Sequence, residues 1–160
     1  MIIEIFTDGA CSGNPGKGGY RIVMKVPEKN YEKRYSQGYR LTTNNRMELL
    51  AVITALEKLK STENDIHIYT DSKYVVDAIQ KKWLQSWMKI GFKNKKNPDL
   101  WKRMIPLLKE HKTTFHWVKG HAGHLENEIC DQLAVKAAQT EPLLIDAFFE
   151  NQKDGGLFDK

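Results

Sequence analysis

The chain has 160 residues, 41% of them hydrophobic and 28% charged, which excludes wholesale disorder and suits one domain with a real core. Two cysteines are too few for a disulfide scaffold or a cysteine-based zinc module. No apolar run approaches the ~18 residues of a membrane span, and the first residues, MIIEIFTDGA, lack the basic and apolar regions of a signal peptide. We therefore expect a soluble, cytoplasmic protein with no membrane contact.

The net charge of +5 is unevenly distributed along the chain. Between Lys81 and Gly120 lie 11 basic and two acidic residues, a balance of +9, whereas the remainder carries 14 basic and 18 acidic residues, a balance of −4. A basic lobe on a mildly acidic body predicts a polyanionic partner. A solvated, lysine-rich surface explains the same charge and stays open as an alternative.

Three strands are expected at the start of the chain. Residues 2–7 are β-prone, and residues 20–26 and 31–40 alternate between apolar and polar side chains. The stretch DGACSGNPGKGG, between the first two strands, is typical of a turn-rich loop because glycine and proline recur in it. Consecutive strands with short connections predict an antiparallel meander.

A helix, a strand and a second helix follow. Residues 47–60 have apolar side chains around most of the helical circumference, which predicts a buried helix. Residues 66–70 form a short apolar strand, and the pattern after Asp71 predicts one helix that continues through two tryptophans to Gly91. Strand–helix–strand order after a meander predicts an α/β fold whose sheet is partly parallel.

The remaining pattern predicts a helix, a fifth strand and a last helix. Asn97-Pro98 is typical of a helix start, and Pro106 is expected to kink or end that helix. Residues 113–118 predict the strand, and residues 130–138 carry apolar positions at helical spacing. Residues 141–160 differ from the rest of the chain in their pattern. The apolar segment LLIDAFF can dock on the body, whereas QKDGGLFDK is typical of a frayed end.

Three acidic residues are expected where a strand or helix meets a loop. Asp8 ends the first strand, Asp71 ends the fourth, and Glu48 falls in the first turn of the first helix. Ligands collect outside the carboxyl ends of parallel strands, so Asp8 and Asp71 emerge side by side if their strands are neighbours. Closely spaced carboxylates need a cation, and this set of hard oxygens suits Mg²⁺ or Mn²⁺.

Each acid also has a purely structural explanation, which stays open at this point. Asp71 can cap the helix that follows it, and Glu48 can form a capping box with Asn45. Asp8 precedes a glycine and suits a turn. Asp131 falls in the first turns of the last predicted helix and can act as a partner of the helix dipole.

Two other motifs were tested against known chemistry. Gly16-Lys17 lacks the earlier glycine and the following Ser or Thr of a Walker A loop, and Arg21 replaces the last glycine of a dinucleotide motif. His121 and His124 lie in a glycine-flanked loop with Cys130 downstream, but a zinc site would need a fourth ligand. A titratable imidazole beside acidic residues better suits proton transfer.

The chain resembles bacterial type 1 ribonuclease H (ribonuclease HI) in five segments that follow that family's order over nearly all of residues 1–140: IFTDGACSGNPGKGGY, TTNNRMELLAVITALE, YTDSKYV, NPDLW and WVKGHAGHLENEICDQLA. The resemblance implies a ribonuclease H-like α/β fold, with a mixed five-stranded sheet of three antiparallel and then two parallel strands, flanked by helices. Residues 141–160 fall outside it and are expected to form an extension that is partly docked or disordered.

The resemblance also implies an activity. The family hydrolyses the RNA strand of RNA–DNA hybrids with two Mg²⁺ ions, for which Mn²⁺ can substitute, and leaves 5′-phosphate and 3′-hydroxyl ends. A monomer without an obligate protein partner is expected.

Site residues carry over by matching positions. The family's metal-binding carboxylates match Asp8, Glu48, Asp71 and Asp131, and its loop histidine matches His121. Residues that contact the hybrid match Asn14, Asn44 and Asn45, and the phosphate pocket on the DNA strand matches Thr43 and Asn97. The basic handle of the family resembles KKWLQSWMKIGFKNKK, in which the candidate contacts are Lys82, Trp83, Trp87, Lys89 and Lys93.

This chain departs from the family pattern in two places. The handle is shorter and less basic than in the best-known bacterial form, with Met88 and Ile90 where Lys or Arg is expected. Lys73 stands where many relatives have Gln.

Two other functions fit the sequence less well. A DNA-cutting nuclease of the same broad fold, such as a transposase- or resolvase-like enzyme, is disfavoured by KGHAGH and TTNNRME. A non-catalytic module that only binds hybrids would be expected to have lost one or more of the acids, and all four are present.

Overall fold

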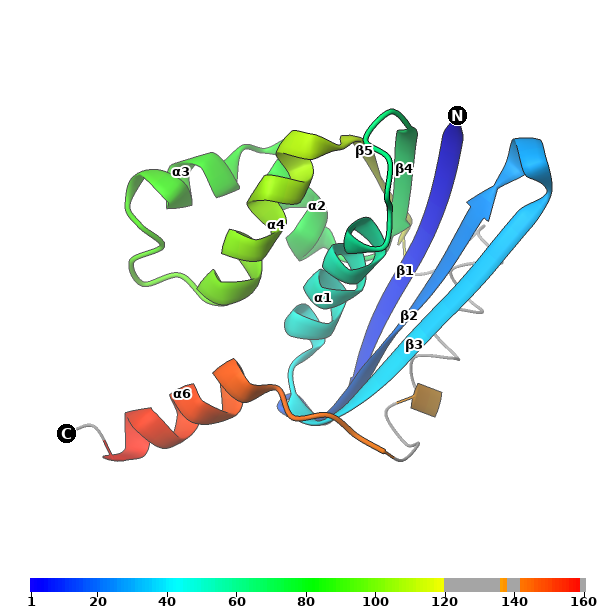
Figure 1. Ribbon diagram of the computed structural model, residues 1–160. Helices are drawn as coiled ribbons and strands as arrows, with labels where there is room; N and C mark the ends of the chain where they lie inside the picture. The colour runs from blue at the N-terminus through cyan, green and yellow to red at the C-terminus, as the bar shows by residue number, and fades with distance from the viewer. Residues whose placement is uncertain (120–135, 138–141, 159–160) are drawn as a thin grey trace.

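A five-stranded mixed sheet forms the centre of the computed structural model, which describes residues 1–119, 136–137 and 142–158 (Figure 1). The strand order is β3-β2-β1-β4-β5, antiparallel between β1, β2 and β3 and parallel between β1, β4 and β5. The strands are β1 (Ile2–Ser12), β2 (Gly16–Val26), β3 (Tyr31–Thr42), β4 (Asp65–Thr70) and β5 (Lys112–Trp117). The expected α/β fold with three antiparallel and two parallel strands is confirmed.

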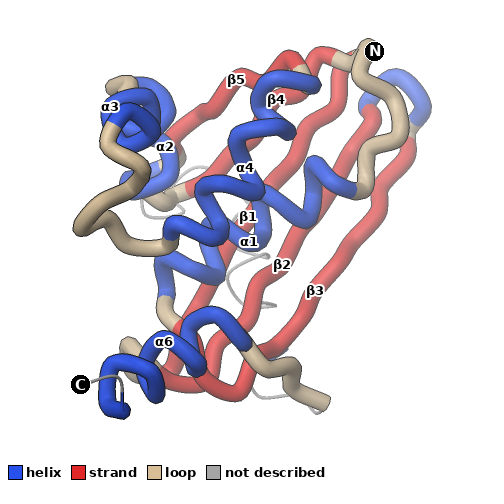
Figure 2. Tube along the Cα trace, turned by 60° about the vertical axis from the view of Figure 1, so that its left-hand side comes forward, coloured by secondary structure: helices blue, strands red, loops and turns tan. Residues whose placement is uncertain are grey.

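Helices α1 and α4 cover one face of this sheet (Figure 2). The described helices are α1 (Asn44–Glu57), α2 (Lys73–Gln80), α3 (Trp83–Lys89), α4 (Pro98–Glu110) and α6 (Ala147–Phe158), with a 3₁₀ turn η1 (Pro27–Lys29). Within the described ranges, no helix is both long enough and apolar enough to span a membrane.

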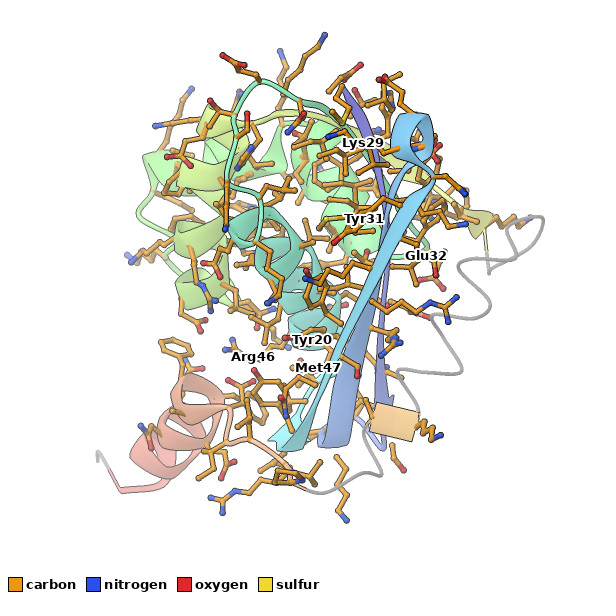
Figure 3. All side chains as sticks on the ribbon, turned by 45° about the vertical axis from the view of Figure 1, so that its right-hand side comes forward. Tyr20, Lys29, Tyr31, Glu32, Arg46 and Met47 are labelled. Atoms are coloured by element: carbon orange, nitrogen blue, oxygen red, sulfur yellow. The ribbon has the colours of Figure 1, made fainter. Side chains whose placement is uncertain are left out.

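The core lies between the sheet and α1. Apolar side chains surround α1 because the sheet lies on one side of it and α4 on the other, as its predicted burial requires. Met47 of α1 is fully buried, as is Trp101 of α4, and Tyr20 of β2 faces the same interior (Figure 3). This packing fixes the start of α1 against the middle of β1.

The sequence predicts a turn-rich loop between the first two strands, and this prediction is wrong. Strand β1 continues to Ser12 and β2 begins at Gly16, so most of the stretch is a paired hairpin. A Cβ at Gly9 would lie 2.6 Å from the backbone nitrogen of Glu48, and one at Gly18 would lie 2.6 Å from Cγ2 of Thr42. Gly9 therefore allows close approach of the α1 backbone, and Gly18 leaves room for the Thr42 side chain, so neither is explained by a turn.

One prediction about the helices is wrong, and of the two outcomes expected at Pro106 the ending of the helix is wrong. The single helix expected from Asp71 to Gly91 is two helices, because Lys82 adopts a left-handed backbone with φ of 61° between α2 and α3. Helix α4 continues past Pro106 to Glu110. Pro106 is exposed, so water can solvate the carbonyl of Lys102 that loses its helical donor.

Candidate active site

Three carboxylates meet at one edge of the sheet. Asp8 comes from β1, Asp71 follows the last residue of β4, and Glu48 lies near the start of α1. One ligand oxygen from each lies within 4.8 Å of the others. Strands β1 and β4 are parallel neighbours, as the sequence argument required, although Asp8 lies inside β1, opposite Arg21 of β2, rather than at its end.

Backbone and hydroxyl groups orient two of these carboxylates. The backbone N–H of Gly9 donates to Oδ1 of Asp8 at 2.9 Å and to Oε1 of Glu48 at 3.2 Å. The hydroxyl of Thr70 donates to Oε2 of Glu48 at 3.4 Å. Asp8 is 1% exposed and Glu48 is 8% exposed, so these oxygens have little access to bulk water.

The structural alternatives for Asp71 and Glu48 are wrong. Ser72, not Asp71, caps α2, because its hydroxyl accepts from the backbone N–H of Val75 at 3.2 Å. Thr43 is the N-cap of α1 and accepts from the backbone N–H of Arg46 at 3.2 Å. Neither acid is therefore explained by helix capping.

The electrostatics of this cluster favour a bound cation. The pKa of Glu48 is raised to about 8, chiefly by burial and also by the negative charge of Asp71, against the opposing effect of its hydrogen bonds. A divalent cation removes this penalty because it favours the ionised form of each carboxylate. Three clustered carboxylates suit Mg²⁺ or Mn²⁺, which prefer oxygen ligands.

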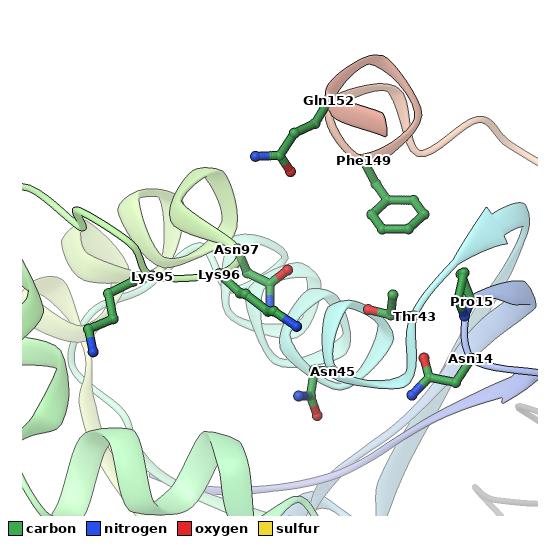
Figure 4. Close-up of a pocket in the computed structure, with 9 residues that line it drawn as sticks. All are labelled: Asn14, Pro15, Thr43, Asn45, Lys95, Lys96, Asn97, Phe149 and Gln152. Carbon is green, nitrogen blue, oxygen red and sulfur yellow. The ribbon is translucent and has the colours of Figure 1, made fainter. Parts of the chain in front are cut away.

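Asparagines extend from the carboxylates into a second cavity. The carboxylate cavity, of about 390 Å³, is also lined by Asn44, Asn45 and Lys73. A second cavity, of about 510 Å³, is lined by Asn14, Pro15, Thr43, Asn45, Lys95, Lys96, Asn97, Phe149 and Gln152 (Figure 4). Asn45 lines both cavities, so the predicted hybrid contacts and the predicted phosphate pocket adjoin the carboxylates.

Asn14, Asn44 and Asn97 have defined local roles. Oδ1 of Asn14 accepts from the backbone N–H of Asn44 at 3.2 Å, which links the β1–β2 hairpin to the first turn of α1. Asn97 precedes α4 in a left-handed backbone with φ of 61° and makes no side-chain cap. Its amide donates instead to the hydroxyl of Tyr74 at 3.2 Å.

The predicted handle lies on α3 and the turns around it. Trp83 is 41% exposed, whereas Trp87 is half-buried against the edge of Trp101, with ring centroids 5.8 Å apart. Lys82 precedes α3 in a left-handed backbone and Lys89 is the last residue of α3, so the two lysines do not share one helix. Lys93 lies in the turns after α3.

His121 and Asp131 lie outside the described residues. Five residues that line the second cavity are absent from the sequence-based prediction: Pro15, Lys95, Lys96, Phe149 and Gln152. Lys95 and Lys96 could have been found from their position next to Asn97 in a basic stretch, whereas Phe149 and Gln152 lie beyond the resemblance and carry no motif.

Comparison with known proteins decides the family. The RNase H family model matches residues 2–139. The chain belongs to the ribonuclease H family. It is accordingly an endonuclease that cleaves RNA in RNA–DNA hybrids, as the sequence resemblance implied.

Several curated family members are similar along most of the chain. Ribonuclease H of Rippkaea orientalis is 52% identical over 155 residues, which cover 94% of this chain and 93% of that protein. Ribonuclease H of Desulforamulus reducens is 56% identical over 149 residues, covering 90% and 92%. Ribonuclease HI of Synechocystis sp. is 47% identical over 152 residues, covering 92% and 94%.

Solved ribonuclease H structures share the fold. LC9-RNase H1, a type 1 RNase H with the type 2 active-site motif, superposes with a TM-score of 0.73 at 32% identity, over 86% of this chain and 72% of that one. LC11-RNase H1, solved in complex with an RNA/DNA hybrid, has a TM-score of 0.67 at 25% identity, over 86% and 96%.

Proposed function

We propose that Asp8, Glu48, Asp71 and Asp131 hold two Mg²⁺ ions at which the RNA strand of a hybrid is hydrolysed to 5′-phosphate and 3′-hydroxyl ends. The observation that carries this proposal is the meeting of three carboxylates, two of them buried, with oxygens within 4.8 Å. When bound, two such metal ions would activate the attacking water and stabilise the leaving 3′-oxygen. Mn²⁺ offers the same oxygen chemistry and can substitute.

The protein's own groups orient this chemistry. The N–H of Gly9 holds one oxygen each of Asp8 and Glu48, and the hydroxyl of Thr70 holds the other oxygen of Glu48. These carboxylates therefore present fixed lone pairs before a cation arrives, which reduces the reorganisation that binding requires. We assign His121 the transfer of a proton, or assistance to product departure.

Substrate contacts are proposed along the two adjoining cavities. Asn14, Asn44 and Asn45 suit recognition of the ribose 2′-hydroxyl, because an amide both donates and accepts hydrogen bonds. Thr43 and Asn97 suit a phosphate of the DNA strand. The exposed ring of Trp83 and the half-buried ring of Trp87, with the lysines Lys82, Lys89 and Lys93, form the basic handle that contacts the duplex.

We also propose a monomeric enzyme of the cytoplasm without an obligate protein partner. Residues 1–140 would form the ribonuclease H domain, and residues 141–160 would form an extension outside the family match.

The test labels each strand of an RNA–DNA hybrid in turn and incubates it with Mg²⁺ or with EDTA. Only the RNA strand is expected to be cut, and only with the metal. A DNA duplex of the same sequence is the control and is expected to stay intact. Efficient cutting of that duplex would favour the DNA-nuclease alternative, and binding of the hybrid without cleavage would favour the non-catalytic module.

A further inference from the structure

The segment that begins at residue 142 contributes Phe149 and Gln152 to the second cavity, although it lies outside the family match. Leu144 bridges to β3: its N–H donates to the carbonyl of Gly38 at 2.9 Å, and its carbonyl accepts from the N–H of Arg40 at 3.0 Å. The guanidinium of Arg40 also binds Glu150 of α6, at 2.7 Å. The start of α6 is therefore fixed to the end of β3.

One buried guanidinium links α6 to the opposite wall of the cavity. Arg46 of α1 is 3% exposed and donates to both oxygens of Asp146, at 2.7 and 2.9 Å. It also donates to both oxygens of Asp99, at 2.9 and 2.7 Å, and to Oδ1 of Asn97 at 3.2 Å. The position of α6 relative to Asn97 is thus set by charge-assisted hydrogen bonds at both ends.

The cavity between these walls has the chemistry of a site for a nucleic-acid backbone. Phe149 and Gln152 of α6 face it from one side, and Lys96 and Asn97 from the other (Figure 4). Among the described lining residues there are two lysines, several amides, one hydroxyl and no carboxylate. Lysine and amide donors suit phosphate oxygens, and the ring of Phe149 offers an apolar surface to a sugar.

A nucleic-acid strand bound in this cavity would be the strand that is not cut. The scissile phosphate must lie at the carboxylates, and none of the three lines this cavity. Asn45 lines both cavities, so a duplex whose RNA strand lies at the carboxylates can place its other strand beside α6.

We propose that α6 is a wall of the groove for the DNA strand, in which Gln152 donates to the sugar–phosphate backbone and Phe149 packs on the adjoining sugar. This inference rests on the proposed function of Thr43 and Asn97 as a phosphate pocket, which it extends. The segment after residue 142 is then a substrate-positioning element held in place by Arg46.

The test compares two nearly isosteric substitutions on neighbouring exposed residues of α6. Gln152→Glu places a carboxylate in the cavity, whereas Asn151→Asp creates the same charge on a residue that does not line it. At near-physiological salt we expect Gln152→Glu to raise KM for the hybrid by about 5- to 10-fold through lost hydrogen bonding and repulsion, with kcat unchanged. Asn151→Asp should change KM by less than about twofold, because exposed charges are screened.

A second measurement locates the contact. Neutral methylphosphonates are placed one at a time along the DNA strand, and the penalty of Gln152→Glu should vanish at one position only, because the repelled charge is then absent. Gln152→Lys should lower KM, which keeps the inference testable if the glutamate variant melts early.

Equal effects of Gln152→Glu and Asn151→Asp, or a penalty that no DNA-strand position relieves, would overturn the role of α6. A wild-type protein that leaves the hybrid uncut would instead overturn the proposed function. The two failures are therefore distinguishable.

Discussion

Removal of the Arg46 guanidinium should be among the most destabilising single changes on this face of the molecule. In Arg46→Met the volume is kept, but the carboxylates of Asp146 and Asp99 lose their shared cation, and Asn97 loses a donor. Breaking a buried pair by removing one partner typically costs about 3–5 kcal/mol. Asp146 keeps its hydrogen bond from the hydroxyl of Thr42, at 2.7 Å, and Asp99 is partly exposed to water. We therefore expect the free energy of unfolding to fall by about 3 kcal/mol, at the lower end of that range.

The assay is urea unfolding followed by circular dichroism, with thermal melting beside it. A loss of about 3 kcal/mol corresponds to a fall in Tm of about 6–12 °C for a domain of this size. Arg103→Met is the matched control, because Arg103 makes a similarly short, two-point pair with Glu57 that is exposed on the surface. Such surface pairs contribute about 0–1 kcal/mol. Equal losses in the two variants would refute the reasoning from burial.

Four further outcomes are expected. Asp8→Asn should nearly abolish hydrolysis of the hybrid and leave the circular dichroism spectrum unchanged; near-wild-type turnover with an unchanged Mg²⁺ response would contradict the metal assignment. The raised pKa of Glu48 predicts that the metal-free fold loses stability as pH rises from about 4.5 to about 8, because the folded chain holds a proton that the unfolded chain releases. Excess Mg²⁺, or the substitution Glu48→Gln, should flatten this dependence of the free energy of unfolding on pH. A dependence that neither change affects would be evidence against the burial argument. His121→Ala should lose ~10²–10⁴-fold in kcat yet keep Mg²⁺ binding in calorimetry, and loss of that binding would make the histidine a ligand. Neutralising Lys82, Lys89 and Lys93 together should raise KM for the hybrid and flatten its salt dependence by up to about one unit per lost phosphate contact. An unchanged salt dependence would show that the duplex binds elsewhere on the protein.

The sheet and the carboxylate cluster could be predicted because they depend on order along the chain. Strand–helix–strand order predicted a partly parallel sheet, and Asp8 and Asp71 meet because β1 and β4 are parallel neighbours in that sheet. Which residue capped each helix was not predictable in this way. Thr43 and Asn45 are both good caps, and the structure uses Thr43, whose hydroxyl accepts from the backbone N–H of Arg46.

The failures have a common physical origin in tertiary packing. No residue next to Lys82 in the sequence predicts its left-handed backbone, because the helical periodicity of apolar residues continues across Lys82. The position of α6 depends on Arg46 meeting Asp146, a contact between residues that no local pattern connects. His121 and Asp131 stay predictions, because both lie outside the described residues.

The Arg46–Asp146 pair also has a consequence for the order in which the molecule assembles. Its partners are 100 residues apart, so forming the pair before the rest of the chain has folded costs the entropy of closing a long loop. We expect α6 to dock last when the chain folds and to undock first in partial opening, before the sheet loses protection from hydrogen exchange. A folded enzyme with α6 undocked would keep its carboxylates and lose one wall of the groove. The hydrogen-exchange rate of the α6 amides would therefore report the fraction of molecules in which α6 is docked and the binding surface is complete.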